Sequence, residues 1–169
     1  MQYSKEVIKK YKFRRYDKRF PDIYKREKIK LKKVIPNAII EHIGSTAVPG
    51  LGGKGIIDIL VAVNRKEINK IKNQLERANY VFKESGGESD RLFFKKNYKY
   101  HGKTRIVHLQ LTHHDSYIFK RMIKFRDKLI KDKEYAKKYE GVKKEAVKIA
   151  RGEGKIYRKH KKKIFKEIK

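Results

Sequence analysis

The sequence predicts a single α+β domain over residues 1–169, with a small mixed sheet in about residues 7–113 and a helical part in about residues 114–169. Two observations carry this prediction. Short apolar runs alternate with helical-period stretches up to residue 113, whereas the remainder shows helical periodicity and no strand pattern. A chain of 169 residues is also long enough to bury one hydrophobic core.

The first elements expected are a strand and a helix. Residues 7–16 alternate loosely between apolar and polar types, which predicts an edge strand. Pro21 suits the first turn of a helix, and residues at helical spacing follow it, including Glu27 on the apolar face. This helix is expected over about residues 21–33, because Pro36 cannot continue it.

The next stretch predicts strands on either side of a helix. Residues 38–43 form a short apolar strand, and residues 55–63 form a nearly continuous apolar run that is typical of a buried central strand. Asn64 is a suitable helix cap, and apolar residues recur at helical spacing through residues 65–78. Residues 80–83 then return as a strand.

A hairpin and three helices complete the expected order. Residues 91–97 and 104–112 are predicted to pair as a hairpin. The Asp115-Ser116 pair can cap a helix with an apolar face, and further helices are expected over about residues 133–150 and 155–168. These last helices could form a lobe packed beside the sheet.

The candidate chemistry lies in the turn between the strands over residues 38–43 and 55–63. Gly44, Ser45 and Thr46 supply backbone amides and hydroxyls that can cradle phosphate oxygens. Asp58 follows Ser45 by 13 positions, and a carboxylate at a strand end can hold a divalent metal. The structural alternative is that Ser45 only caps a short helical turn.

Asp58 is the most informative charged residue, because it interrupts an apolar strand. A carboxylate there is costly to bury unless a partner compensates it. That partner could be Lys54 or an arginine, in which case the residue is structural; otherwise Asp58 is a metal ligand or a catalytic base. Two-metal nucleotidyl transfer normally needs a second carboxylate two positions on, where this chain has Leu60.

Histidines offer further candidates. His108 and Gln110 share one face of a predicted strand, and His113 and His114 follow at its end. Any of the histidines could help Asp58 to bind a metal or a phosphate, although a structural role is the more common one for a strand histidine. Gln110 is a poor metal ligand, which weakens a His-x-His site.

The chain is strongly basic, with 48 Lys and Arg against 19 Asp and Glu and a net charge of +29. Residues 1–35 hold 14 basic and 4 acidic side chains, and residues 111–169 hold 21 and 8, so the excess lies in the flanking segments. Such a field attracts polyanions, which makes RNA or DNA a natural partner. The alternative is that the lysines of the last helices form a solvated surface that serves solubility.

Composition also limits the cellular setting. There is no cysteine, so neither disulfides nor thiolate metal sites can form. No run of 18 apolar residues occurs, which excludes a membrane span, and no apolar signal core follows Met1. A cytoplasmic protein with no membrane partner is therefore expected, and the oligomeric state is not determined by the sequence.

Residues 41–51, Lys54 and residues 56–59 resemble the signature of the GrpB-like family, which belongs to the nucleotidyltransferase superfamily with the DNA polymerase beta type of fold. The resemblance extends over most of the chain. It includes the N-terminal block (Tyr16-Asp17, Phe20-Pro21, Tyr24 and Glu27), the middle (Arg91, Phe93-Phe94 and His108) and the helical end (Phe125-Arg126-Asp127, Leu129, Tyr139 and residues 157–161).

The resemblance implies a small mixed sheet of the nucleotidyltransferase type, with helices on one side and a helical C-terminal part. It also implies a nucleoside triphosphate at Gly44-Ser45 and Asp58, with Mg²⁺ as the ion. The chain departs from the family pattern at Gly55, where Pro is usual, and at Gln110, where a second histidine is frequent.

Together these observations predict a nucleotidyltransferase that moves a nucleotidyl group from a triphosphate to an unknown acceptor, with RNA as one candidate. The predicted catalytic residues are Asp58, His108 and Lys54, with Asp58 also the metal ligand. The predicted nucleotide-binding residues are Gly44, Ser45, Thr46, His42 and Arg105. The alternatives are a non-catalytic nucleotide- or RNA-binding module that lacks the second carboxylate, and another phosphate chemistry in the same cleft.

Overall fold

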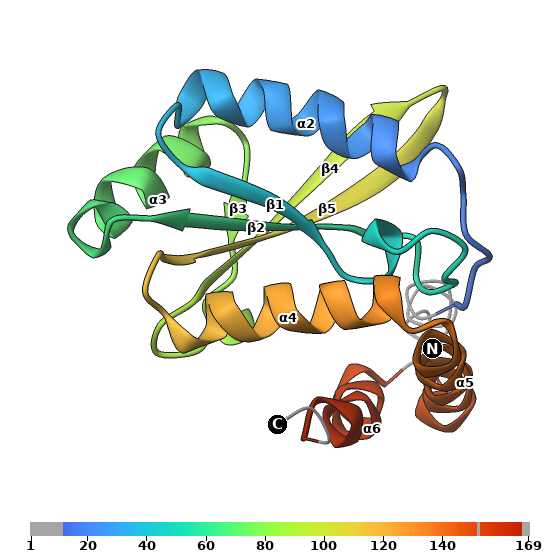
Figure 1. Ribbon diagram of the computed structural model, residues 1–169. Helices are drawn as coiled ribbons and strands as arrows, with labels where there is room; N and C mark the ends of the chain where they lie inside the picture. The colour runs from blue at the N-terminus through green and yellow to red at the C-terminus, as the bar shows by residue number, and fades with distance from the viewer. Residues whose placement is uncertain (1–11, 152, 167–169) are drawn as a thin grey trace.

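A computed structural model describes residues 12–151 and 153–166 of the chain (Figure 1). The strands are β1 (Ile39–Ile43), β2 (Ile57–Val63), β3 (Val81–Phe82), β4 (Leu92–Tyr100) and β5 (Lys103–His113). The α-helices are α2 (Phe20–Val34), α3 (Ile68–Arg77), α4 (Tyr117–Lys131), α5 (Lys133–Ala150) and α6 (Gly154–Lys166). Short 3-10 turns occupy η1 (Ser45–Ala47), η2 (Arg65–Glu67) and η3 (Glu84–Gly86).

The strands form one mixed sheet in the order β1-β2-β5-β4-β3. β2 and β5 run parallel, and the other neighbouring pairs are antiparallel. β2 lies between two partners and six of its seven residues are buried, which explains its continuous apolar sequence. The parallel register sets Asp58 directly opposite His108.

Helices cover both faces of this sheet. On one face, α2 and α3 pack on a core that includes Ile59 and Val61 of β2 and Leu109 of β5. On the other face lies α4, directly below the sheet in Figure 1. Arg126 ties this helix to β1, since its guanidinium donates to Glu41 Oε2 at 2.6 Å and to the His42 carbonyl at 3.1 Å. The expected arrangement, with helices on one side of the sheet and a separate helical C-terminal part, is confirmed, and α4 is the member of that part that covers the second face.

The C-terminal helices lie beside the α4 face of the sheet (Figure 1). α4 and α5 share an apolar cluster with the turn that follows β1, built from Val48, Leu51, Phe125, Leu129 and Tyr139. α5 and α6 pack on each other through Ala146, Ala150 and Tyr157. The expected helical C-terminal part is confirmed, and its tyrosines 139 and 157 are buried packing residues.

The expected order of elements matches the structure after residue 20. Ser116 caps α4 by accepting a hydrogen bond from Phe119 N at 3.0 Å, and Asn64 accepts one from Lys66 N at 3.0 Å. The N-terminal edge strand is not formed in its described part, residues 12–16, where Arg14 makes one isolated bridge to Gly53; residues 7–11 lie outside the described residues. No described helix is long and apolar enough to cross a membrane.

Candidate functional site

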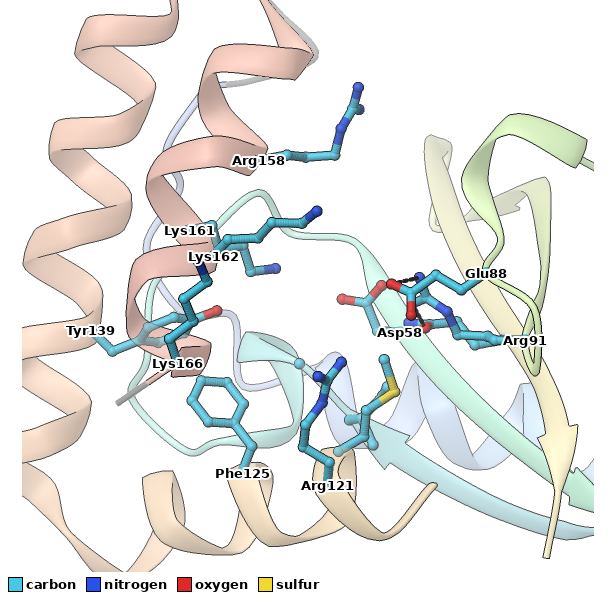
Figure 2. A pocket seen from close by; sticks show the side chains of 14 residues that line it. Asp58, Glu88, Arg91, Arg121, Phe125, Tyr139, Arg158, Lys161, Lys162 and Lys166 are labelled. Carbon is cyan, nitrogen blue, oxygen red and sulfur yellow. Dashed lines mark hydrogen bonds and ion pairs between the residues drawn. The ribbon is translucent and has the colours of Figure 1, made fainter. Parts of the chain in front are cut away.

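Asp58 and Gly44 lie in a pocket of about 440 Å³ between the α4 face of the sheet and the C-terminal helices. The walls differ in character (Figure 2). Asp58 and Arg91 come from the sheet side, Phe125 lies on the α4 side, and Tyr139 comes from α5. Met122 of α4 adds a second apolar side chain to the lining. The cationic side chains that line the pocket are Arg91, Arg121, Arg158, Lys161, Lys162 and Lys166.

The carboxylate of Asp58 is held by a histidine and remains partly open to the pocket. Asp58 Oδ1 lies 3.5 Å from His108 Nδ1, and the Asp58 side chain is 25% exposed. Burial raises the pKa of Asp58 as the largest single effect, but the His108 contact and the charges of Lys161 and Lys54 outweigh it and hold that pKa below its ordinary value. Asp58 is therefore an anion at neutral pH.

Gly44 forms the part of the backbone that touches this carboxylate. Its φ of 73° and ψ of −173° define a conformation that only glycine adopts without strain. A Cβ placed there would lie 3.1 Å from Asp58 Cγ and closer still to Oδ2. The glycine therefore serves two purposes, since it starts the η1 turn and lets the chain approach Asp58.

Ser45 belongs to the η1 turn and does not cap it, because the capping position is Gly44 and no side-chain cap bond forms. The Ser45 side chain packs against Gly53, where a Cβ would meet both Ser45 Oγ and, at 3.2 Å, Lys143 Nζ. Lys54 lies nearby with its ammonium 4.6 Å from the centre of the Tyr157 ring. The structure thus brings Gly44, Ser45, Lys54 and Asp58 to one region.

Lys143 is a site residue that the sequence reading missed. Its side chain is buried, its ammonium donates to the Gly52 carbonyl and it lies 4.7 Å from the centre of the Tyr139 ring. Burial is the main cause that lowers the pKa of Lys143 to about 7, and nearby Lys161 adds to it. The available signal was its spacing with Tyr139, Ala146 and Ala150, which places Lys143 on the buried stripe of α5.

Glu140 completes the contacts of this part of α5 with the loop before β2. Glu140 Oε2 accepts a hydrogen bond from Gly52 N at 3.0 Å, so α5 binds both polar groups of one residue through Glu140 and Lys143. The N-terminal segment binds the next residue in the same way: Arg14 N donates to Gly53 O at 2.6 Å, and Gly53 N donates to Arg14 O at 2.9 Å. The loop at Gly52-Gly53 is therefore bound by α5 on one side and by the N-terminal segment on the other.

His42 and Thr46 do not reach the pocket. His42 lies on the α2 face of β1, where its ring stacks on Tyr24 with centroids 4.4 Å apart. Its Nε2 lies 2.9 Å from Thr46 Oγ1, which donates to the Ile56 carbonyl at 3.2 Å. Burial lowers the pKa of His42 to about 4, so the ring is neutral at pH 7. These contacts give both residues structural roles.

Arg105 is also absent from the pocket. It lies three positions before His108 on β5, so the two side chains leave opposite faces of the sheet. Arg105 Nη2 pairs with Asp17 Oδ2 at 3.2 Å beside the start of α2. A role in neutralising charge at Asp58 is therefore incompatible with its position.

The remaining polar candidates on β5 are separated along the strand. His113 is opposite Val63, at the far end of β2 from Asp58, and its Nε2 lies 2.9 Å from Arg65 Nη2. Gln110 shares the face of His108 and accepts a hydrogen bond from Arg91 Nη1. His108 is consequently the histidine that this strand presents to Asp58, packed edge-on against Phe93 at 4.9 Å between ring centres.

The donors present fit one magnesium ion shared with a ligand and do not fit a two-metal centre. Leu60, the position of the usual second carboxylate, is fully buried. Within residues 12–151 and 153–166, no group of three or more His, Cys, Asp or Glu side chains is arranged to hold a metal. Mg²⁺ is commonly bound by one or two carboxylates together with substrate phosphates, and Asp58 can supply one such oxygen donor.

The five-stranded mixed sheet, its covering helices and the glycine turn beside Asp58 define an α+β protein with a pocket between the sheet and its C-terminal helices. The chain belongs to the GrpB family, whose model, described as "GrpB protein", matches residues 10–169. The crystal structure of the conserved protein GrpB from Enterococcus faecalis is similar, with a TM-score of 0.70 and 25% identity over 92% of this chain and 98% of that one.

Two curated relatives carry the same family resemblance. The chain is 31% identical to the UPF0157 protein YqkA of Bacillus subtilis over 133 residues, which are 77% of this chain and 38% of that protein. It is 29% identical to a UPF0157 protein of Vibrio cholerae over 133 residues, 79% of this chain and 68% of that protein. The chain therefore spans much less than the full length of the Bacillus protein. A likeness to the Cid1 poly(U) polymerase, with a TM-score of 0.42, is too weak to transfer residue roles.

Proposed function

We propose that the pocket at Asp58 binds the polyphosphate of a nucleoside triphosphate and that the protein transfers a nucleotidyl group from it to an acceptor. The observation that carries this proposal is the combination of the Asp58 carboxylate, which touches the Gly44 backbone, with a wall of arginine and lysine side chains. A pocket of this charge favours a polyanion, and the carboxylate is placed where a phosphate-bound cation can be shared.

Arg91 supports the same proposal. Its Nη1 donates to Gln110 Oε1 and its Nη2 pairs with Glu88 Oε1 at 3.2 Å, but its buried Nε finds no hydrogen-bond partner among the described residues. Buried donors are almost always satisfied in proteins, so an unsatisfied one beside a pocket points to a missing acceptor. A phosphate oxygen of the triphosphate would be such an acceptor.

The pair of Asp58 and His108 supplies the proton chemistry of the proposed reaction. With Nδ1 directed at the Asp58 carboxylate, the other ring nitrogen of His108 can accept the proton of an acceptor hydroxyl. The acceptor oxygen then bonds to the α-phosphorus, and the bond from that phosphorus to the bridging oxygen breaks, releasing pyrophosphate. The cationic wall stabilises the charge on the leaving pyrophosphate. Mg²⁺, when bound, would neutralise phosphate charge, with Asp58 as its protein ligand.

The test asks whether magnesium strengthens or weakens the binding of a nucleoside triphosphate. Titration calorimetry with each nucleoside triphosphate is performed on the parent chain and on Asp58→Asn, with magnesium or with a chelator. The parent should bind at least tenfold more tightly with magnesium. Asp58→Asn should lose that gain, yet bind the metal-free triphosphate as well as the parent or better, because a repelling charge is gone. Asp115→Asn is the control, since Asp115 is exposed at the far end of β5.

Equal magnesium dependence in the parent and in Asp58→Asn would contradict the assigned role of Asp58. The reaction is tested separately by incubation with labelled triphosphates and total cellular RNA, followed by separation by size. Label in one RNA class would identify RNA as the acceptor, and with it the nucleotide. The proposal includes the cytoplasmic location and the RNA partner that the sequence predicts.

A second candidate is a module that binds nucleotides or RNA without turnover. The buried Leu60 favours it, because the second metal-binding carboxylate of nucleotidyl transfer has no place on this strand. This candidate predicts triphosphate or RNA binding that weakens steeply with salt and gives no product. The same two experiments separate it from the transferase.

A further inference from the structure

A second pocket, of about 180 Å³, lies at the start of α2 and has no part in the proposed reaction. Its lining combines five cationic side chains with one carboxylate: Arg14, Arg15, Arg19, Lys103, Arg105 and Asp17. We refer to it as the Asp17 pocket. β5 contributes Lys103 and Arg105 ahead of the point where it pairs with β2, so the pocket lies beyond the end of the sheet at which Asp58 is found.

Arg105 provides the main evidence that this cluster is a binding site. Its side chain is 10% exposed, and one of its terminal nitrogens pairs with Asp17 Oδ2 at 3.2 Å. Its Nε is buried and finds no hydrogen-bond partner within residues 12–151 and 153–166. Leaving a buried guanidinium donor unsatisfied is costly, so its orientation is explained if an anion accepts from it.

Asp17 does not neutralise the pocket as a whole, because its carboxylate is already paired with two of the arginines. Its carboxylate accepts from Arg19 Nε at 2.9 Å and from Arg19 Nη2 at 2.8 Å, as well as from Arg105. The hydrogen bonds from Arg19 are the main cause that holds the pKa of Asp17 well below its usual range. One carboxylate thus stands against five cations, which leaves four positive charges around the hollow.

The start of α2 adds to this field. The helix is 15 residues long and begins at Phe20, a residue that also lines the pocket. Its first turn points the positive end of the helix dipole in this direction. Arginine forks in such a setting match the oxygens of a phosphate group, which can accept several charge-assisted hydrogen bonds at once.

We propose that the Asp17 pocket binds a phosphate group, at a site separate from the triphosphate at Asp58. The phosphate comes either from free phosphate and nucleotides or from the backbone of a nucleic acid strand. The two pockets are connected through the main chain, because Arg14 pairs with Gly53 in both directions and Gly53 packs against Ser45. A phosphate held by Arg14 and Arg105 would thus fix one side of the loop that carries the turn at Gly44.

The experiment follows the arginine Nε–Hε signals of the full chain by NMR during titration at constant ionic strength. One arm adds inorganic phosphate, and the other adds a short oligouridylate without a terminal phosphate. The Arg105 signal should shift and saturate in at least one arm. Saturation with inorganic phosphate alone identifies a free phosphate or nucleotide, whereas tighter saturation with the oligonucleotide identifies a nucleic acid backbone.

Variants test whether the side chains of the Asp17 pocket cause the binding seen in the titration. Arg105→Gln, followed through the Nε–Hε signal of Arg14 in the same pocket, should weaken the binding about tenfold or more. Because this substitution also removes the pairing with Asp17, the exposed pair Arg15→Gln/Lys103→Gln is tested as well and should weaken the binding without unfolding the chain. Arg77→Gln, an exposed arginine at the end of α3, is the matched control.

Asp58→Asn is expected to leave the binding at Arg105 unchanged, which separates this inference from the proposed function. The inference is overturned if the Arg105 signal does not respond in either arm. It is equally overturned if the Arg15→Gln/Lys103→Gln variant binds both ligands as the parent and Arg77→Gln do.

Discussion

The carboxylate of Asp58 lies against the backbone of Gly44, with its Cγ 3.1 Å from the point that a Cβ on Gly44 would occupy. Two separate requirements thus meet at one residue. The η1 turn needs a residue at φ 73°, and the carboxylate needs a neighbour without a side chain. This contact connects the glycine turn of the sequence to the acid on β2.

Gly44→Ala should therefore destabilise the protein by more than about 2 kcal/mol, since backbone strain and a clash with Asp58 add up. It should also abolish magnesium-dependent triphosphate binding. Gly50→Ala is a matched control, because Gly50 has φ 81° but nothing within 4 Å of its added Cβ. That control should cost about 1–2 kcal/mol and leave binding intact. Equal losses in both variants, measured by urea unfolding, would argue against the contact with Asp58.

Restoring the missing second carboxylate should fail. Leu60 is fully buried in the sheet, so Leu60→Asp removes core contacts and also places a carboxyl group away from water. Leu60→Ala is the control for lost contacts alone and should cost about 2–5 kcal/mol. Leu60→Asp should cost more at pH 7, and the excess should shrink in acid as the buried group takes up a proton. A stable, more active Leu60→Asp protein would disprove this account of position 60.

Lys143 predicts a specific dependence of stability on pH. Because burial lowers its pKa from 10.5 in the unfolded chain to about 7, the unfolded state binds more protons between those values. The free energy of unfolding should rise from about pH 7 toward pH 10, and Lys143→Met should reduce that rise. Lys144→Met, on the exposed side of α5, is the control and should leave the slope unchanged. Denaturant unfolding at several pH values measures these slopes.

Glu27 is buried on α2, where Tyr80 donates to its Oε1 at 2.5 Å and Lys96 at 2.7 Å. Burial raises its pKa, but the hydrogen bonds from Lys96 and Tyr80 outweigh that effect and leave it lowered. Glu27→Gln should cost about 3 kcal/mol at pH 7. This difference should be complete above the unfolded pKa of about 4.3 and disappear as the pH falls through the lower folded value. Thermal melts at several pH values measure both effects, and the exposed Glu76→Gln variant on α3 should show neither of them.

Local patterns explain why much of the fold was predictable. The apolar run around Asp58 predicted a buried strand, and β2 is the second strand from the edge with partners on both sides. Ser116 and Asn64 were recognised as caps, since their side chains bond to nearby backbone amides in a way that depends on local sequence. The spacing that placed Glu27 on the apolar face of its helix was also correct.

The errors at His42 and Arg105 share one physical origin, which is that the sequence does not say which face of the sheet carries the pocket. His42 and Arg105 leave the α2 face, so their chemistry is directed away from Asp58. Alternation along β5 already predicts that Arg105 and His108 lie on opposite faces of the sheet, which excludes Arg105 from the site at Asp58. Lys143 was missed because its burial depends on α5 docking against the Gly52-Gly53 loop, which is a long-range contact.

The acid and the imidazole are borne by neighbouring parallel strands, whereas most of the cations around them come from helices. The hydrogen bonds between β2 and β5 keep Asp58 and His108 in fixed register, whichever side chains the surrounding helices carry. Under the proposed function, exchange of the α6 residues would therefore alter which ligand binds, while Asp58 and His108 would stay in place. Ligand choice and the proposed proton chemistry would then belong to separate elements of the fold.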